Sequence, residues 1–283
     1  MTNRPRALSG LTEIIAGYDL FLIDQYGVLH DGHRPFHGSL AALEAISKAG
    51  KTSVILTNSG KRAKPNADRL LRIGFQDGSF SHVVSSGEVC WRAIKEGRLG
   101  APFVAGARAL LIGRRGEDYE LDGIGITLTD DASSADFVLI LGSDAPAVSL
   151  AGYRQLLMPA ARAGLPALCA NPDKQMLSPQ GLLPAPGSIA QVYRQLGGKV
   201  RFIGKPYADI YRFALGLAPE VTASRVLAIG DSVEHDIAGA AHMGLASLLI
   251  RGGILAGLNE AELNRLYEEY RVWPAYRLDL LAP

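Results

Sequence analysis

Several polar side chains that could take part in catalysis lie at, or shortly after, the ends of short apolar segments. Asp24 directly follows the apolar run 20–23, and Asp231 follows the apolar run 226–229 after a single glycine. In a parallel sheet the carboxyl ends of the strands share one edge, where open α/β folds bind their ligands. We therefore expect these polar groups to converge at one place. They are Asp24, Thr57, Asn58, Ser59, Lys205, Asp231 and Asp236.

Carboxylates, hydroxyls and one lysine together indicate a site that binds a cation and an anion. Carboxylates that face one another repel, and without a counter-charge some of them stay protonated. A hard divalent cation with oxygen ligands removes this repulsion, and Mg²⁺ is the usual choice. Lys205 and the Thr57 hydroxyl would then bind anionic oxygens, such as those of a phosphate. One of the carboxylates could attack phosphorus and form an aspartyl-phosphate.

Alternating strands and helices are predicted to position these groups. Ser39 is a candidate helix N-cap and Gly50 a helix stop, and the chain up to residue 96 follows the order β-α-β-α-β-α. That order implies a parallel sheet with right-handed crossovers. Strands of this first sheet are predicted at 18–23, 52–56, 82–85, 201–203, 225–229 and 246–250.

The alternation is interrupted at residues 100–107, which are rich in glycine and proline. A new set of strands and a helix follows, and residues 171–187 form a predicted Pro- and Gly-rich loop. We expect an α/β fold with a Rossmann-like parallel-sheet core formed by residues 1–106 and 187–283. Residues 107–186 are then a smaller α/β domain inserted into that core.

The composition is that of an ordinary globular protein. The chain of 283 residues carries 29 basic and 28 acidic residues, so its net charge of +1 gives no reason to expect binding to nucleic acid or to an anionic membrane. No apolar run approaches the roughly 20 residues of a membrane helix. Cys90 and Cys169 are predicted to be buried free thiols, and we expect a cytoplasmic protein.

The polar groups and their order resemble the haloacid dehalogenase-like (HAD) superfamily of hydrolases over the whole length of the chain. The inserted domain resembles the large cap of class IIA, the branch of p-nitrophenyl-phosphatase-like and sugar-phosphatase-like enzymes. Gly204-Lys205-Pro206 and the triplet Asn171-Pro172-Asp173 are typical of that branch. The family's motifs correspond to Asp24-Gln25-Tyr26-Gly27-Val28, Thr57-Asn58, Lys205, and Gly230-Asp231 with Asp236.

The resemblance implies a role for each group. Asp24 would be the nucleophile and, with Asp231, Asp236 and the carbonyl oxygen of Tyr26, a ligand of Mg²⁺. The transferring phosphoryl group would be held by Thr57, Asn58 and Lys205, with Ser59 as a further substrate-binding position. Asn171 and Asp173 are candidates to face the substrate. The implied activity is hydrolysis of a small phosphorylated metabolite beneath a closing cap, and homodimers are common in the branch.

Tyr26 departs from the family's phosphatases, which carry a second aspartate at this position. That aspartate protonates the leaving oxygen and then activates water, whereas tyrosine, with a pKa near 10, is a poor general base at neutral pH. One interpretation is a phosphatase with reduced or altered activity. A second is a relative that binds a phosphometabolite without turnover. A third is a 2-haloacid dehalogenase, because those enzymes carry Asp-x-Tyr-Gly, although they need no metal.

Overall fold

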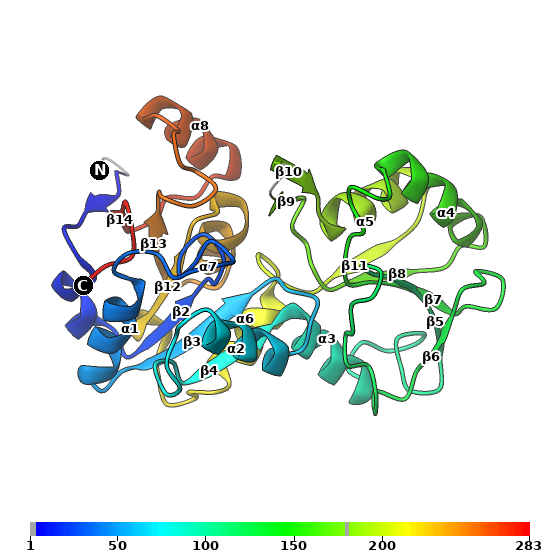
Figure 1. Cartoon of the computed structure of the whole chain (residues 1–283), viewed down its shortest axis with the longest axis horizontal. Coiled ribbons are helices and arrows are strands. Elements are labelled where there is room, and N and C mark those ends of the chain that lie inside the picture. Colours follow the sequence, from blue (N-terminus) through cyan, green and yellow to red (C-terminus); the bar gives the residue numbers. More distant parts are fainter. Residues whose placement is uncertain (1–3, 179–180) are drawn as a thin grey trace. The chain divides into compact units, whose positions relative to one another are not determined.

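The computed structural model describes residues 4–178 and 181–283 and divides into two compact units. The first unit comprises Met1–Thr57, Lys64–Val84 and Lys205–Pro283, and the second comprises Asn58–Ala63 and Ser85–Gly204. Each unit is built around its own sheet, and Figure 1 labels all strands of the two sheets except β1.

The first unit contains a seven-stranded sheet in the order β1-β14-β13-β12-β2-β3-β4. Neighbouring strands pair in parallel throughout the part of this order that runs from β1 through β14, β13, β12 and β2 to β3. The strands are β1 (Arg6–Ala7), β2 (Leu20–Ile23), β3 (Thr52–Thr57), β4 (His82–Ser85), β12 (Val226–Gly230), β13 (Ala246–Ile250) and β14 (Tyr276–Leu278). The helices are α1 (Ser39–Lys48), α2 (Ala63–Arg72), α6 (Ala208–Leu215), α7 (Ala238–His242) and α8 (Glu260–Tyr270).

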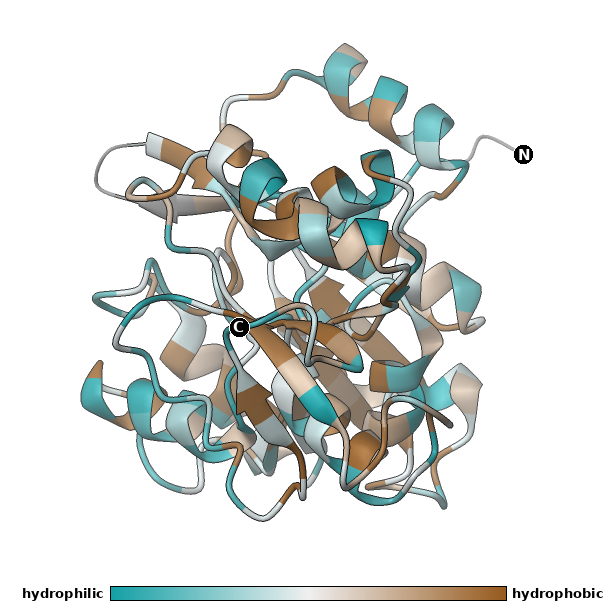
Figure 2. Ribbon diagram, turned by 90° about the vertical axis from the view of Figure 1, so that its right-hand side faces the viewer, coloured by the Kyte–Doolittle hydropathy of each residue, from teal (hydrophilic) through white to brown (hydrophobic). Residues whose placement is uncertain are grey.

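Apolar side chains on both faces of the first sheet explain why its strands were visible as continuous apolar runs. All four residues of β2 are buried, as expected for a parallel strand covered on both sides. Along β13, Leu248 and Ile250 join the core cluster that contains helix α1, whereas Leu249 joins a second cluster with α8. In Figure 2 the strands are mostly hydrophobic, whereas the helices combine hydrophobic and hydrophilic residues.

The second unit contains a five-stranded parallel sheet in the order β11-β8-β7-β5-β6. Helices α4 and α5 lie side by side and contribute Leu157 and Ile189 to its core (Figure 1). An antiparallel hairpin is formed by β9 and β10. The strands are β5 (Arg108–Ile112), β6 (Thr127–Thr129), β7 (Phe137–Ile140), β8 (Ala167–Cys169), β9 (Gln175–Ser178), β10 (Gly181–Pro184) and β11 (Val200–Phe202); the helices are α3 (Ser86–Lys95), α4 (Leu150–Arg162) and α5 (Pro186–Gln195).

Two sequence-based expectations about this region were wrong. The strand predicted at 201–203 for the first sheet is β11, which pairs with β8 in the second sheet. The predicted loop 171–187 contains the β9–β10 hairpin and the start of α5. The predicted inserted domain, 107–186, thus lies inside a unit that extends to Gly204 and includes α3. A strand of only three residues, such as β11, carries too little apolar pattern to reveal its partner.

The first unit also contains short helical turns. Residues 11–17 form two short 3₁₀ turns, η1 (Leu11–Glu13) and η2 (Ile15–Gly17), rather than one helix, and a third, η3 (Ala223–Arg225), precedes β12. A π-helical turn, η4 (Val233–Ile237), precedes α7. Within the described ranges, none of the helices combines the length and the apolar character that crossing a bilayer demands.

Candidate active site

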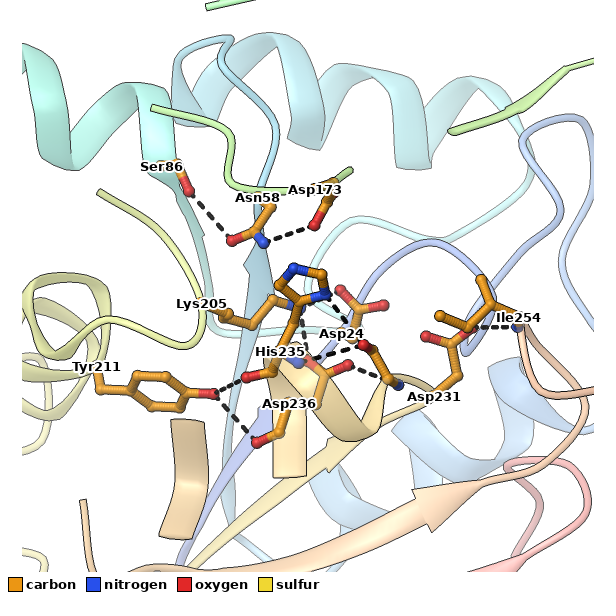
Figure 3. A network of polar contacts seen from close by, with 11 residues as sticks. Asp24, Asn58, Ser86, Asp173, Lys205, Tyr211, Asp231, His235, Asp236 and Ile254 are labelled. Carbon is orange, nitrogen blue, oxygen red and sulfur yellow. Dashed lines mark hydrogen bonds and ion pairs between the residues drawn. The ribbon is translucent and has the colours of Figure 1, made fainter. Parts of the chain in front are cut away.

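Asp24 lies at the carboxyl end of β2, where the first sheet ends. Its backbone N–H donates to the carbonyl of Ile229 on β12 at 2.8 Å, so the pairing of the two central strands fixes its position. Its side chain forms a buried ion pair with Lys205, which also donates to Asp236 at 2.7 Å. One lysine therefore joins two carboxylates, as Figure 3 shows.

Asp231 follows β12 and is held between two glycines. A Cβ atom at Gly27 would lie 2.0 Å from Asp231 Oδ2, and one at Gly253 would lie 1.8 Å from the same oxygen. Neither position can therefore carry a side chain without moving the carboxylate. The N–H of Ile254 donates to Asp231 Oδ2 at 2.8 Å. Ile254 was not among the predicted site residues, and the signal nearest to it in the sequence is the Gly252-Gly253 pair after β13.

Asp236 lies on the π-helical turn η4, a feature that often marks functional sites. Its Oδ2 accepts the backbone N–H of Ser232 at 3.1 Å, and Tyr211 donates to the carbonyl oxygens of this turn. A Cβ at Gly230 would lie 2.0 Å from the Asp236 carboxyl carbon, so this carboxylate packs directly on the backbone at the end of β12.

The three aspartates form a buried cluster with an excess of negative charge. One ligand oxygen from each of Asp24, Asp231 and Asp236 lies within 4.8 Å of the others. Burial raises the pKa of Asp231 well above its usual value, and the charges of Asp24 and Asp236 raise it further. Burial alone would lower the pKa of Lys205, but Asp236 and Asp24 raise it, so this lysine stays charged.

A single lysine does not balance three carboxylates at this spacing. An added divalent cation would neutralise the remainder, and a set of donors made only of carboxylate oxygens suits Mg²⁺. The residues present therefore fit the predicted cofactor. The predicted role of the Tyr26 carbonyl as a further ligand stays a prediction.

The Tyr26 side chain is fixed within its own loop. Its hydroxyl donates to the carbonyl oxygen of Asp31 at 2.7 Å, and its ring packs edge-on against His30. The proton of this hydroxyl is therefore bonded to the main chain. Tyr26 is part of the site through its position in the loop after Asp24, and its phenol does not reproduce a carboxylate.

Thr57 is the buried last residue of β3, in the first unit, and the chain enters the second unit at Asn58. There the Asn58 side-chain Nδ2 donates to Asp173 Oδ1 at 2.8 Å, and Ser86 Oγ donates to Asn58 Oδ1 at 3.3 Å (Figure 3). Ser59 Oγ accepts the N–H of Lys61 at 3.3 Å. Ser86 was not predicted as a site residue, because its place in the sequence indicates only the start of a helix.

The triplet 171–173 forms a compact turn in the second unit. Asn171 Oδ1 accepts the N–H of Asp173 at 3.1 Å, and the Asn171 carbonyl accepts the thiol of Cys169. Asn171 therefore shapes the turn, and Asp173 is bonded to Asn58. The structure thus brings together Asp24, Lys205, Asp231 and Asp236 in the first unit, and Asn58, Asp173 and Ser86 in the second.

The chain is similar to known proteins over most of its length. A family model described as haloacid dehalogenase-like hydrolase matches residues 21–127, and one described as HAD-hydrolase-like matches residues 202–279. The chain is 26% identical over 288 residues to chronophin of Bos taurus, covering 97% of this chain and 94% of that protein. A glycerol phosphate phosphatase of Mycobacterium tuberculosis, solved in complex with magnesium, is 26% identical with a TM-score of 0.73, covering 94% of this chain and 76% of that one.

A solved hydrolase of the haloacid dehalogenase-like family from Brucella suis is similar over nearly its entire length. It is 30% identical with a TM-score of 0.84, and the match covers 97% of this chain and 99% of that chain. The parallel first sheet, the carboxylate cluster at its edge and these matches lead to the same conclusion. The chain belongs to the haloacid dehalogenase-like hydrolase family.

Proposed function

We propose that the protein is a Mg²⁺-dependent phosphohydrolase that cleaves the phosphate ester of a small phosphorylated metabolite. The observation that carries this proposal is the buried cluster of Asp24, Lys205, Asp231 and Asp236 at the edge of the first sheet. It combines a strand-end nucleophile, a charged lysine and an oxygen-only cation site. The similarity to a glycerol phosphate phosphatase solved with magnesium supports both the substrate class and the cofactor.

Asp24 would act as the nucleophile in this reaction. One oxygen of its carboxylate attacks phosphorus, the bond from phosphorus to the leaving oxygen breaks, and an aspartyl-phosphate forms. Lys205, bonded to Asp24 and Asp236, holds the nucleophile in place and carries positive charge toward the phosphoryl oxygens. Thr57 is the buried hydroxyl at the end of the neighbouring strand and would bind the same group.

Asp24, Asp231 and Asp236 would hold the Mg²⁺ ion. When bound, the ion neutralises charge on the carboxylates and on the phosphoryl oxygens. Ile254 N–H and the space left by Gly27 and Gly253 keep the Asp231 carboxylate oriented for this purpose. Water then attacks phosphorus and releases phosphate and free Asp24, a step for which Tyr26 supplies no carboxylate base.

A phosphatase assay tests the proposal directly. The purified protein is assayed with p-nitrophenyl phosphate and a panel of sugar and glycerol phosphates, with Mg²⁺ and with a chelator. We expect phosphate release that requires Mg²⁺ and is lost in Asp24→Asn, while the exposed-site variant Asp122→Asn keeps the wild-type rate. Release of no phosphate from any ester in the panel would refute the activity.

A non-catalytic phosphometabolite-binding protein is the second candidate, favoured by one observation. The Tyr26 hydroxyl donates to the Asp31 carbonyl, so the position two residues after the nucleophile offers no carboxyl group as acid or base. Tight binding of a phosphometabolite without turnover, in the wild type and in Tyr26→Asp, would establish this function. The dehalogenase hypothesis is weaker because it leaves Asp231 and Asp236 without a purpose; chloride release from a 2-haloacid in the presence of a chelator would support it.

The predicted cytoplasmic location and the homodimer stay predictions from the sequence. Sedimentation of the purified protein would measure the oligomeric state.

A further inference from the structure

The side-chain amide of Asn58 is held at both ends by groups of the second unit. Its Nδ2 donates to Asp173 Oδ1 at 2.8 Å, and its Oδ1 accepts the Ser86 hydroxyl at 3.3 Å. Asn58 is 4% exposed and Ser86 is fully buried. The two bonds distinguish the donor end of the amide from the acceptor end, so the amide has one preferred orientation.

Gly204 lies where these residues meet. A Cβ there would lie 2.4 Å from Ser86 Oγ and 2.7 Å from Asn58 Oδ1, and the backbone has a φ of +128°. Only glycine fits this space and this conformation. The backbone at Gly204 is therefore packed directly against the Asn58–Ser86 pair.

Both Asn58 and Gly204 are the covalent neighbours of predicted phosphate-binding residues. Thr57 precedes Asn58, and Lys205 follows Gly204. The chain leaves one unit and enters the other at each of these two peptide bonds. A group that fixes Asn58 and Gly204 therefore also restrains the backbone from which the Thr57 hydroxyl and the Lys205 side chain extend.

We propose that Asp173 is a positioning residue for phosphoryl transfer, acting through Asn58, with Ser86 as its partner. This inference rests on the proposed phosphohydrolase function. Asp173 contributes a carboxylate that orients the Asn58 amide, and the oriented amide fixes the Thr57–Asn58 and Gly204–Lys205 peptides. Asp173 then has no contact with the leaving group of the substrate, in contrast to the substrate-facing role that the sequence predicted for it.

A swap of the two side chains provides the sharpest test. In the single variant Asn58→Asp, two carboxylates face each other and the hydrogen bond between residues 58 and 173 is lost. In the double variant Asn58→Asp with Asp173→Asn, the amide at position 173 can donate to the carboxylate at position 58, so the hydrogen bond is restored in the opposite direction. We expect Asp173→Ala to lower kcat/KM about a hundredfold, as small misplacements of reacting groups do. Asp173→Asn should be milder because its oxygen still accepts a hydrogen bond. The swap should recover at least roughly tenfold over Asn58→Asp alone.

The choice of substrates separates positioning from substrate contact. With p-nitrophenyl phosphate and glycerol 3-phosphate, a positioning residue lowers kcat/KM by the same factor for both. A change in their ratio of more than about tenfold in Asp173→Ala would show that Asp173 touches the leaving group and would overturn the proposal. A swap variant no better than Asn58→Asp would also overturn it. Melting temperatures of all variants, and Asp122→Asn as the control, exclude loss of folding as the cause.

The inference can be tested even if the proposed function fails. If the wild type hydrolyses no ester, binding of inorganic phosphate in the presence of Mg²⁺ is measured by calorimetry for the same variants. We expect Asp173→Ala to weaken binding roughly tenfold and the swap to restore it. An unchanged affinity in Asp173→Ala would contradict the positioning role, independently of any turnover.

Discussion

Tyr26 shows how one side chain can limit a site whose other parts are present. Its hydroxyl donates to the Asp31 carbonyl at 2.7 Å and its ring packs on His30, so it cannot serve the reacting groups as a carboxylate would. We expect Tyr26→Asp to raise phosphate release from alkyl phosphates by roughly 10²-fold, within the usual range for general acid–base catalysis. Tyr26→Phe removes the hydroxyl without adding a carboxylate, so it should give no increase. A lower rate in Tyr26→Asp than in the wild type would contradict this account.

His30 is a buried imidazole with a consequence for stability against acid. Burial, assisted by the charge of Arg69 and opposed by Asp31, lowers its pKa from 6.5 to about 4. The folded state therefore favours neutral His30, and the unfolded state binds more protons between pH 6.5 and 4. The resulting stability is fully present above pH 6.5 and is lost as the pH falls toward 4. It amounts to about 3 kcal/mol.

Urea unfolding at pH 7 and at pH 4.5 measures this contribution. The wild type should lose more stability over this interval than His30→Asn, by an amount on the order of 2 kcal/mol. Equal losses in the two proteins would show that His30 does not titrate in this way. The comparison with His30→Asn removes the effect of the carboxylates that titrate in both proteins.

The residues of the site were predictable where they follow strands and unpredictable where they depend on packing. Asp24 and Asp231 were recognised because each follows a buried apolar run at the end of a strand, as other polar groups of the same sheet do. Ser86 and Ile254 contribute through a hydroxyl bond and a backbone N–H, which are set by the spatial approach of separate segments. Nothing in one sequence records such an approach. The sequence identifies a candidate side chain, whereas its hydrogen-bond partner becomes known only from the three-dimensional structure.

At the scale of elements, the first turn of α3 is joined to the segment 58–63 by a buried carboxylate. Glu88 accepts from Arg62 Nε at 2.6 Å and from Arg92 Nε at 2.9 Å. Burial would raise the pKa of Glu88, but Arg62 and Arg92 lower it to about 2. The ion pairs are therefore present at neutral pH, and their contribution decreases as the pH falls below 4.5 toward 2.

Glu88→Gln should therefore destabilise the second unit. The change leaves Arg62 close to a neutral group at a site where the Glu88 side chain is only 9% exposed. We expect a loss of about 2 kcal/mol in the free energy of unfolding. Glu96→Gln breaks the exposed pair with Arg98 and should cost less than about 0.5 kcal/mol. Denaturant unfolding of the two variants measures both values, and similar losses would contradict the prediction.

Gly253, in the loop after β13, leads to a prediction about metal binding. A Cβ at Gly253 would lie 1.8 Å from Asp231 Oδ2, so Gly253→Ala must displace that carboxylate. We expect the Mg²⁺ concentration for half-maximal activity to rise at least roughly tenfold, as for other changes that misorient a metal ligand. Gly17→Ala, at a position with open space around it, is the matched control. An unchanged Mg²⁺ requirement in Gly253→Ala would show that Asp231 does not bind the ion.

Elements with strong apolar patterns were predicted, and elements set by pairing were not. The strands β2, β3, β12 and β13 stand out as buried runs because parallel strands are covered on both faces. The hairpin β9–β10 lies in a stretch rich in proline and glycine, which are turn residues by composition, and β11 has only three residues. These strands form because their backbones pair with neighbouring strands, and their own side-chain pattern does not predict that pairing.

At the scale of the whole molecule, the chain contains two parallel sheets with separate hydrophobic cores. The chain passes from one unit to the other four times, after residues 57, 63, 84 and 204. The carboxylate cluster belongs to the first unit alone. An ion that binds only to this cluster should therefore stabilise one unit and not the other.

This expectation can be measured by hydrogen exchange with and without Mg²⁺. Binding to the folded state alone stabilises it by about 2.7 kcal/mol at one hundred times Kd, which corresponds to about a hundredfold slower exchange. The bound ion stabilises the folded state because it relieves the repulsion among Asp24, Asp231 and Asp236. We expect slower exchange in β2 and β12, unchanged exchange in β7 and β8, and no effect of Mg²⁺ in Asp231→Asn. Equal protection of both sheets would mean that the two units unfold as one, and protection that persists in Asp231→Asn would place the ion elsewhere.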